Sequence, residues 1–139
     1  MWTAEHSVET TAAPEAIWKL WTDVADWPRW NTDLDRAELA GPFAQGSAIT
    51  MFPREDDPIE LTIAEATEPE RFVDQADIGP IVVRTAHVVE RLGDDRARIV
   101  YRMEITGPEA DTLGPELGPQ ITADFPEVLA KLAATAEGR

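Results

Sequence analysis

Histidine and tyrosine are the scarce side chains of this sequence that could transfer protons. The 139-residue chain has two histidines, His6 and His87, and one tyrosine, Tyr101. A histidine titrates near neutral pH, so it can take up a proton and return it. These types suggest His87 as a general acid or base, Tyr101 as a proton donor to a carbonyl, and His6 as a third proton-transfer group. Such chemistry would suit enolisation, aldol cyclisation or dehydration.

Several other chemistries lack the residues they need. Cysteine is absent, which removes thiolate nucleophiles, thiolate zinc sites and disulfides. No Gly-x-Ser-x-Gly elbow of a serine hydrolase occurs. The glycine-rich run 114–118 has a proline where a phosphate loop would need a free amide. The two histidines and the acids do not show metal-ligand spacing, so we expect neither a metal nor another cofactor.

Charge and hydropathy limit the partners and the compartment. The chain has 27 acidic and 12 basic residues and a net charge of −15. Because that charge repels phosphate groups, we expect no nucleic acid or anionic lipid as a partner. Apolar runs are far shorter than the roughly 20 residues of a membrane span, so no membrane insertion is expected. The first residues lack signal-peptide features, and with the missing cysteines this predicts a cytoplasmic protein.

The hydrophobic pattern predicts seven strands that would position these residues. Residues 2–10 alternate between apolar and polar side chains, as in a half-buried strand. Alternation in 96–106 places Tyr101 on the same face as Ile99, Met103 and Ile105. The length of this last strand predicts a central position in the sheet. The other strands are expected at 33–40, 46–52, 59–63, 71–78 and 81–92, with the acid pairs 56–57 and 94–95 solvated in turns.

Helices are predicted at two places in the chain. Pro14 begins a short helix after the first strand, and a second short helix spans 24–30. Three glycines and three prolines in 107–119 predict a loop that would form the rim of a ligand portal. A long helix is expected from about residue 118 to 137. Pro126 should kink it by removing the hydrogen bond to the carbonyl of Thr122, and Asp124 beside it is expected to be solvated.

With its elements in this order, the sequence resembles the START-like or SRPBCC superfamily, in particular its polyketide cyclase/dehydratase-like branch. The resemblance rests on Ala13-Pro14-Glu15-Ala16-Ile17-Trp18, Trp27-Pro28-Arg29-Trp30-Asn31, the Gly41-Pro42 to Gly46 turn, residues 90–96 and the helix 121–137. These segments cover nearly the whole chain, so we expect a single domain over residues 1–139. The resemblance implies an α+β helix-grip fold: a seven-stranded curved antiparallel sheet wrapped around a long C-terminal helix, with two short helices after the first strand.

The resemblance also implies where the candidate residues meet. In the helix-grip fold the first and last strands are neighbours, and so are the last two. His6 and His87 would then lie on the strands either side of Tyr101, facing an otherwise apolar cavity. The ligand-binding residues expected there are Phe72, Thr85, Ile99, Met103, Ile105, Ile121, Thr122, Phe125 and Leu129, with Trp27 and Trp30 as a lid.

Three functions remain open on the sequence. The leading hypothesis is a domain, monomeric or homodimeric, that binds an apolar or aromatic, lipid-like or polyketide-like small molecule in an internal cavity. The second is a polyketide cyclase, aromatase or dehydratase, a lyase or isomerase, that uses His87 and Tyr101 for proton transfer. The third is a protein-interaction module with a vestigial cavity and an acidic surface.

Overall fold

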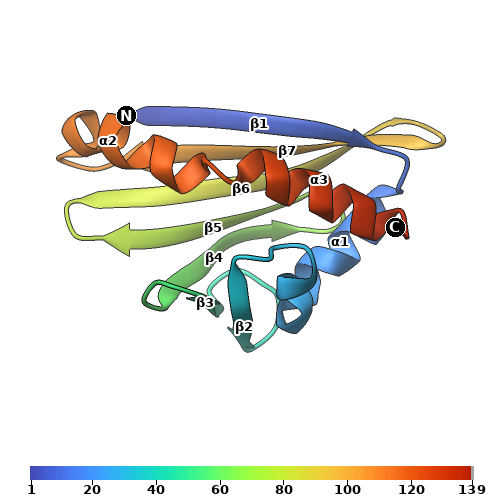
Figure 1. The fold of residues 1–139 in the computed structure, drawn as a ribbon, viewed down its shortest axis with the longest axis horizontal. Coiled ribbons are helices and arrows are strands. Elements are labelled where there is room, and N and C mark those ends of the chain that lie inside the picture. Colours follow the sequence, from blue (N-terminus) through green and yellow to red (C-terminus); the bar gives the residue numbers. More distant parts are fainter. Residues whose placement is uncertain (139) are drawn as a thin grey trace.

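One antiparallel sheet of seven strands forms the frame of the protein (Figure 1). The computed structural model describes residues 1–138. The strand order is β1-β7-β6-β5-β4-β3-β2, so the first strand lies beside the last, as predicted. The strands are β1 (Trp2–Thr10), β2 (Leu34–Ala40), β3 (Ala48–Pro53), β4 (Ile59–Thr67), β5 (Arg71–Ile78), β6 (Ile81–Gly93) and β7 (Arg96–Thr106).

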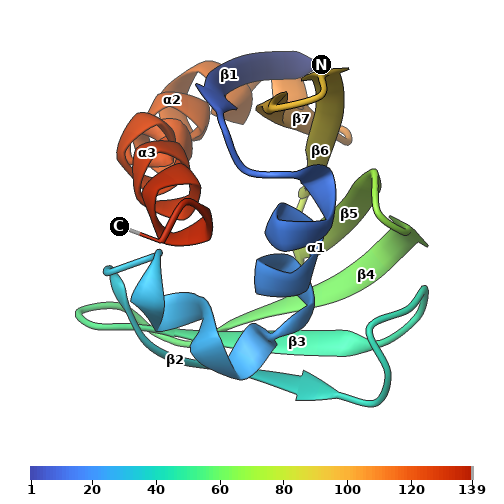
Figure 2. The ribbon, with the colours of Figure 1, turned by 90° about the vertical axis from the view of Figure 1, so that its right-hand side faces the viewer.

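The helices occupy the concave side and the open side of this sheet. Figure 2 shows the sheet bending from β1 round to β2, with two short helices inside the curve and the C-terminal helices across its open side. The helices are α1 (Pro14–Thr22), the 3-10 helix η1 (Val24–Arg29), α2 (Ala110–Thr122) and α3 (Phe125–Ala136). The expected α+β fold is confirmed, including Pro14 as the first residue of the first helix.

The C-terminal helical segment differs from its prediction in two respects. Residues 110–119 belong to helix α2 and not to a loop. The helical segment is interrupted at Ala123 and Asp124, and α3 starts at Phe125. Pro126 is therefore the second residue of α3, where an amide proton has no partner inside the helix. The proline opens a helix instead of kinking one.

The glycines that suggested a loop have a packing role inside α2. Gly114 and Gly118 are buried and face Trp2 of β1. A Cβ atom on Gly118 would lie 2.4–2.6 Å from three carbons of the Trp2 ring, and one on Gly114 would lie 2.5 Å from the Trp2 Cβ. Only glycine lets the helix approach the indole this closely. The contact with Trp2 thus outweighs the low helix propensity of both residues.

Two groups of buried side chains form the core. The larger one joins the short helices, α3 and most of the sheet, and it contains Trp21, Phe72, Ile99, Tyr101 and Leu129. The smaller one lies under α2 and contains Ile81, Val83, Met103, Ile105 and Ala110. Phe125 packs against both groups, so the first turn of α3 connects the two halves of the interior.

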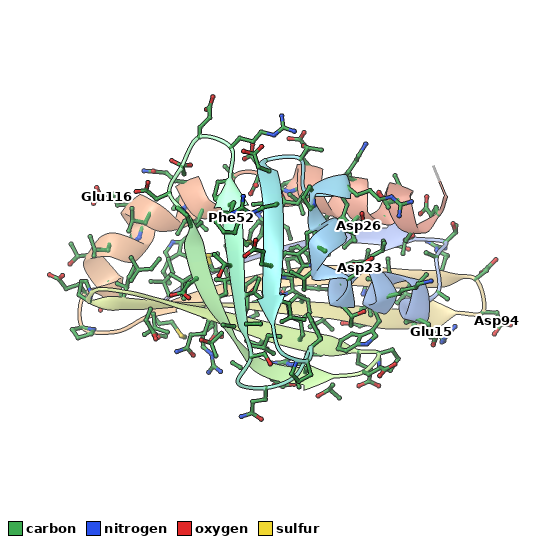
Figure 3. All side chains as sticks on the ribbon, turned by 90° about the horizontal axis from the view of Figure 1, so that it is seen from below. Glu15, Asp23, Asp26, Phe52, Asp94 and Glu116 are labelled. Atoms are coloured by element: carbon green, nitrogen blue, oxygen red, sulfur yellow. The ribbon has the colours of Figure 1, made fainter. Side chains whose placement is uncertain are left out.

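Acidic side chains are spread over the outside of the molecule. Figure 3 labels five of them on separate elements and loops: Glu15, Asp23, Asp26, Asp94 and Glu116. The acid pairs 56–57 and 94–95 are exposed, as predicted. On β3, the ring of Phe52 (Figure 3) lies 3.8 Å under the guanidinium carbon of Arg36. Within residues 1–138, no helix has the length and apolar character to cross a membrane.

Candidate ligand-binding site

The strand register brings four ring-bearing residues into one row across the sheet. His6 of β1 lies opposite Tyr101 of β7, Tyr101 lies opposite His87 of β6, and His87 lies opposite Phe72 of β5. All four share the parity of the core-facing side chains, because side chains alternate between the two faces of a strand. His87 and Tyr101 are buried, whereas His6 is half-buried. The placement of His6 and His87 on either side of Tyr101, which the resemblance implied, is thus confirmed.

The imidazole of His87 is held on both its face and its edge. Its ring stacks on the Phe72 ring with the centroids 3.9 Å apart and the planes 4° from parallel. Its Nδ1 lies 3.3 Å from the backbone oxygen of Phe72. A carbonyl oxygen can only accept a hydrogen bond, so Nδ1 carries the proton in this contact. The neutral ring then has its lone pair on Nε2, where it can accept a proton.

Asp74 is the residue of this site that the sequence reasoning missed. It lies on β5 two residues after Phe72, so its side chain faces the same concave side, and it is only 7% exposed. Its Oδ2 lies 3.8 Å from Nε2 of His87. The signal was present in the sequence, since Phe72, Asp74 and Ala76 share one parity in an otherwise well-defined strand. A carboxyl group at that parity predicts a buried acid.

Burial disfavours the charged forms of both partners. It raises the pKa of Asp74 to about 7. It also lowers the pKa of His87 to about 3, although the carbonyls of Phe72 and Thr85 favour the charged imidazole. Near neutral pH the pair therefore consists of a neutral imidazole and a carboxyl group close to its midpoint. Such a carboxyl group can donate a proton as well as accept one.

Tyr101 has a hydroxyl group with one hydrogen bond made and one donor position left. Its oxygen accepts a hydrogen bond of 3.2 Å from Nε1 of Trp21. Among residues 1–138, no acceptor receives the hydroxyl proton of Tyr101. Burial raises the pKa of Tyr101, with a smaller contribution in the same direction from Asp74, so the phenol stays protonated. A ligand carbonyl on the concave side would be a suitable acceptor for it.

His6 is separated from the other two candidate proton-transfer groups by an aromatic ring. Phe125 meets His6 edge-on with centroids 6.1 Å apart, and it meets Tyr101 edge-on at 5.7 Å. Within the described part of the chain, no hydrogen bond joins His6 to Tyr101 or His87. The structure brings His87, Tyr101 and Asp74 together and leaves His6 on the other side of Phe125.

The predicted ligand-binding residues do not all lie in the same environment. Six are buried on the concave side of the sheet or on α3, namely Phe72, Thr85, Ile99, Met103, Ile105 and Leu129. Ile121, by contrast, is 37% exposed on α2, and the hydroxyl of Thr122 is already bonded to the Gly118 carbonyl at 2.9 Å. Trp27 is buried, and its Nε1 donates a hydrogen bond of 2.9 Å to the Trp21 carbonyl.

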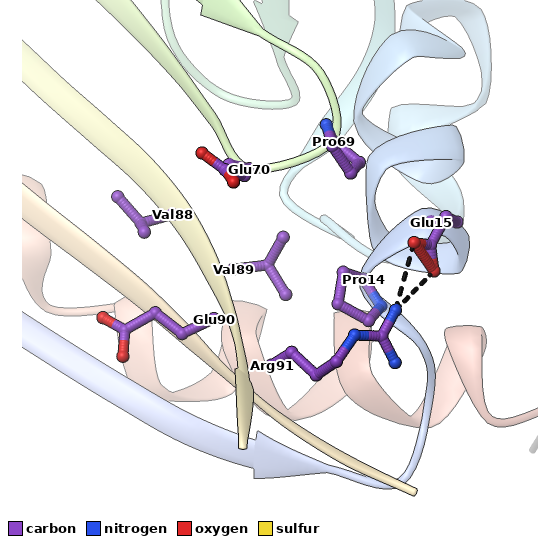
Figure 4. A pocket seen from close by; sticks show the side chains of 8 residues that line it. All are labelled: Pro14, Glu15, Pro69, Glu70, Val88, Val89, Glu90 and Arg91. Carbon is purple, nitrogen blue, oxygen red and sulfur yellow. Dashed lines mark hydrogen bonds and ion pairs between the residues drawn. The ribbon is translucent and has the colours of Figure 1, made fainter. Parts of the chain in front are cut away.

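Two pockets open at the surface rather than next to His87 and Tyr101. One, of about 280 Å³, lies between the start of α1, the β4–β5 turn and β6, where Arg91 bonds to both carboxylate oxygens of Glu15 (Figure 4). The other, of about 410 Å³, lies between the segment after η1 and helix α3, and Trp30 is among its lining residues. Of the predicted ligand-binding residues, Trp30 alone lines either of these two pockets.

Comparison with known protein families shows the family to which this chain belongs. The profile of the family described as "Polyketide cyclase / dehydrase and lipid transport" matches residues 1–137. The chain belongs to this family. The resemblance expected from the sequence is thus confirmed. A search of curated proteins finds no significant match to this chain.

Solved structures share the fold of this family member at low sequence identity. A START superfamily protein from Mycobacterium smegmatis is 14% identical with a TM-score of 0.77, over 98% of this chain and 97% of that one. The di-domain ARO/CYC protein BexL of the BE-7585A biosynthetic pathway is 18% identical with a TM-score of 0.76, over 99% of this chain and 47% of that one. Norcoclaurine synthase from Thalictrum flavum, in complex with dopamine and hydroxybenzaldehyde, is 16% identical with a TM-score of 0.69, over 94% and 84%. These similarities establish the fold and not the activity.

Proposed function

We propose that this domain binds an apolar or aromatic small molecule, lipid-like or polyketide-like, on the concave side of its sheet beside Tyr101, His87 and Asp74. One observation carries the proposal: three polar side chains with hydrogen-bonding capacity to spare lie together in an aromatic and aliphatic interior. A few polar groups in an apolar lining are what a specific small-molecule site requires. The lipid-transport part of the family description agrees with this class of ligand.

Phe125 is the proposed cover of this site. Its ring lies against Tyr101, yet it is only half-buried, whereas the residues beneath it are buried. It is also the first residue of α3, directly after the interruption of the helical segment. Movement of this ring would expose the Tyr101 hydroxyl without displacing a strand. Ligand binding is thus proposed to begin with displacement of Phe125.

The test is a titration followed by tryptophan fluorescence. Trp21 bonds to Tyr101 and lies 6.1 Å from His87 between ring centroids, so its emission should respond to a bound ligand. A panel of aromatic polyketides, fatty acids and steroids would be added to the wild type, Tyr101→Phe, His87→Gln and the exposed-site control Ile121→Ala. At least one class should saturate, with weaker binding in the first two variants and unchanged binding in the control. If no class saturates, the binding proposal is wrong, and the alternative of an interaction module with a vestigial cavity takes its place.

The paired groups Asp74 and His87 favour an enzymatic second candidate, a cyclase, aromatase or dehydratase of polyketide-like substrates. In this proposal Nε2 of His87 removes a proton from the carbon next to a carbonyl, and the Tyr101 hydroxyl donates a hydrogen bond to the enolate oxygen that forms. His87 then returns the proton to the leaving hydroxyl group or to the new alkoxide. Because burial lowers the pKa of His87 to about 3, this step requires Asp74 as a carboxylate beside Nε2, where its charge stabilises the transient imidazolium. His6 would serve substrates that reach past Phe125.

Kinetics separate binding from catalysis once a substrate is identified. His87→Gln and Tyr101→Phe should each lower kcat by at least about a hundredfold, as expected for lost acid–base or oxyanion stabilisation. Asp74→Asn should lower kcat and remove the dependence of the rate on the carboxyl titration. Turnover that persists undiminished in both His87→Gln and Tyr101→Phe would rule out these enzymatic roles while leaving ligand binding intact.

A further inference from the structure

Asp74 is a buried acid to which no group of the protein donates a hydrogen bond. It is 7% exposed and faces the concave side from β5. Among residues 1–138, no N–H or O–H group bonds to its carboxyl group, and no lysine or arginine pairs with it. Burial raises its pKa, and no neighbouring charge offsets that effect. Buried carboxyl groups are normally hydrogen-bonded or paired, so Asp74 is a candidate for contact with a ligand.

The carboxyl group of Asp74 is buried but still accessible. Its side chain and that of His87 each keep 10% of their surface accessible. Within the described residues, the polar side-chain atoms that have neither a partner nor accessible surface are Nε1 of Trp30 and Oδ1 of Asn31. The oxygens of Asp74 are not among them. A small polar group can therefore contact these oxygens without breaking a hydrogen bond of the protein.

Oδ2 of Asp74 and Nε2 of His87 are two acceptors that lie close together without a donor between them. They are 3.8 Å apart, which is too far for a hydrogen bond from one to the other. Nδ1 of His87 carries the ring proton towards the Phe72 carbonyl, so Nε2 has a free lone pair. A donor atom about 2.9 Å from each of them would bridge the two. An ammonium group has three hydrogens and can bond to both atoms, whereas a hydroxyl group can bond to only one.

Charge also favours a cation at this place. A carboxylate at Asp74 has no positive partner among residues 1–138, and the net charge of −15 attracts cations to the protein as a whole. Among the described residues, no further histidine or acid joins Asp74 and His87 to form a metal-binding group. On the neighbouring strands Asp74 is opposite Ile63 and Thr85, and Phe72 precedes it on the same face. The surroundings thus suit an ammonium group attached to an apolar body.

We propose that the ligand of the concave site is a primary amine with an apolar or aromatic body, whose ammonium nitrogen is held between Oδ2 of Asp74 and Nε2 of His87. This inference rests on the proposed function and names the polar group of its ligand. The carboxylate supplies the charge-assisted contact, and the imidazole supplies a second acceptor that fixes the position of the nitrogen. The Tyr101 hydroxyl stays available for an acceptor atom elsewhere in the ligand.

Three compounds of similar size that differ in charge test the proposal directly. 2-Phenylethylamine is the cation, 2-phenylethanol is its neutral counterpart, and phenylacetate is the anion. Each would be titrated into the full chain by calorimetry. At a pH above the Asp74 pKa of about 7, we expect the amine to bind about tenfold more tightly than the alcohol, because its contact is charge-assisted, and the anion to bind most weakly.

Proton release gives a readout that hydrophobic binding alone would not change. Below a pH of about 7 the free protein holds a proton on Asp74, and an ammonium group beside it displaces that proton. The other titratable groups of the site, His87 and Tyr101, stay neutral in this range. Calorimetry in buffers of different ionisation enthalpy should therefore show close to one proton released per bound amine about one pH unit below that pKa. The alcohol should release none.

Matched variants separate the site from the general acidity of the protein. Asp74→Asn keeps the side-chain shape and should weaken amine binding by about tenfold or more, as for a lost charge-assisted contact, while the alcohol binds as before. Asp77→Asn removes the same charge from the exposed face of the same strand and should leave the amine affinity unchanged. Imidazole ¹H–¹⁵N spectra report the second contact, because Nε2 of His87 should shift when it accepts a hydrogen bond from the amine.

Any of four results would overturn the inference: equal affinity for amine and alcohol, no proton release below the Asp74 pKa, equal loss in Asp74→Asn and Asp77→Asn, or an unmoved Nε2 signal of His87. If Asp74→Asn does not fold, proton release by the wild type still decides. A ligand of the fluorescence panel that saturates without any preference for the amine removes this inference and leaves the proposed function intact. If no compound saturates, the amine included, the proposed function is wrong as well.

Discussion

Nε2 of His87 lies 3.8 Å from Oδ2 of Asp74, and both side chains are buried on the concave face of the sheet. This distance is longer than a hydrogen bond, and burial favours the neutral form of each group. The two residues are therefore not an ordinary ion pair. They are a buried acid and a buried base whose protonation preferences oppose each other, which has measurable consequences for stability.

The first prediction concerns the pH dependence of folding when one partner is removed. In His87→Gln, Asp74 remains with a folded pKa of about 7, above its ordinary 3.8, so its stabilisation is present below 3.8 and is lost as the pH rises to about 7. In Asp74→Asn, His87 remains with a folded pKa of about 3, below its ordinary 6.5, so its stabilisation is present above 6.5 and is lost as the pH falls towards 3. In the wild type the two effects cancel between 3.8 and 6.5.

Urea denaturation of both variants and the wild type measures this difference. Relative to the wild type, the free energy of unfolding should fall with pH in His87→Gln and rise with pH in Asp74→Asn, each by up to about 1.4 kcal/mol per pH unit. The largest cause of each shift is burial, which the conservative replacement of the other partner leaves in place. Slopes of the same sign in the two variants would show that these residues do not titrate as described.

The second prediction concerns the hydrogen bond between Trp21 and Tyr101. Tyr101→Phe removes the acceptor of Trp21 Nε1 and leaves a buried donor unpaired, which should cost about 1–3 kcal/mol of folding stability. Trp21→Phe in the same background removes the donor as well. A double-mutant cycle should therefore give a coupling energy of about 1 kcal/mol. Strictly additive effects would mean that the 3.2 Å contact does not contribute to stability.

The third prediction concerns the contact between α2 and β1. Gly118→Ala in a free helix would stabilise it by about 1 kcal/mol. Here the new methyl group would meet the Trp2 ring at 2.4–2.6 Å, so we expect a net loss of about 1–3 kcal/mol. Gly93→Ala is the control, because no atom lies within 4 Å of a Cβ at that position. In a Trp2→Ala background the sign should reverse, and a loss that persists there would show that another contact is responsible.

The fourth prediction concerns the orientation of the two C-terminal helices. Leu129 on α3 is 1% exposed, so Leu129→Ala should destabilise the protein by about 2–5 kcal/mol. Ile121 on α2 is 37% exposed, so Ile121→Ala should cost less than about 1 kcal/mol. Thermal unfolding of the two variants under the same conditions measures the difference. Comparable losses would mean that α2 is turned so that Ile121 enters the core.

The alternating strands were the part of the fold that the sequence predicted best. One face of β1 is half-buried and one face of β7 is buried, while the opposite faces carry charged side chains, so periodicity alone gives both the strand and the side-chain direction. Helix α2 could not be predicted in this way. Glycine is required at positions 114 and 118 by the contact with Trp2, which lies more than a hundred residues away in the sequence. Local helix propensity does not include such a distant contact. The predicted kink at Pro126 is wrong for a different reason: the helical segment is interrupted at Ala123 and Asp124, so the proline lies in the first turn of α3.

The sequence singled out His87 and Tyr101 of the candidate site but not Asp74. Composition does not distinguish Asp74 from the other acids, because the chain has 27 acidic residues and most acids lie at the surface. The alternation in β5 places Asp74 on the buried face with Phe72. Its role in the candidate site becomes clear only from the structure, in which His87 of the neighbouring strand lies beside it. The pocket between the segment after η1 and helix α3 could not be predicted, since its two sides come from distant parts of the chain.

The row formed by His6, Tyr101, His87 and Phe72 makes the site sensitive to strand alignment. Each member comes from a different strand, and three separate ladders hold the row together. A shift of β7 by one residue would turn Tyr101 to the solvent and bring Val100 or Arg102 to the interior. Formation of the candidate site and correct pairing of the central strands are thus a single event, so a chain misaligned in this region would lose the candidate site and its core together.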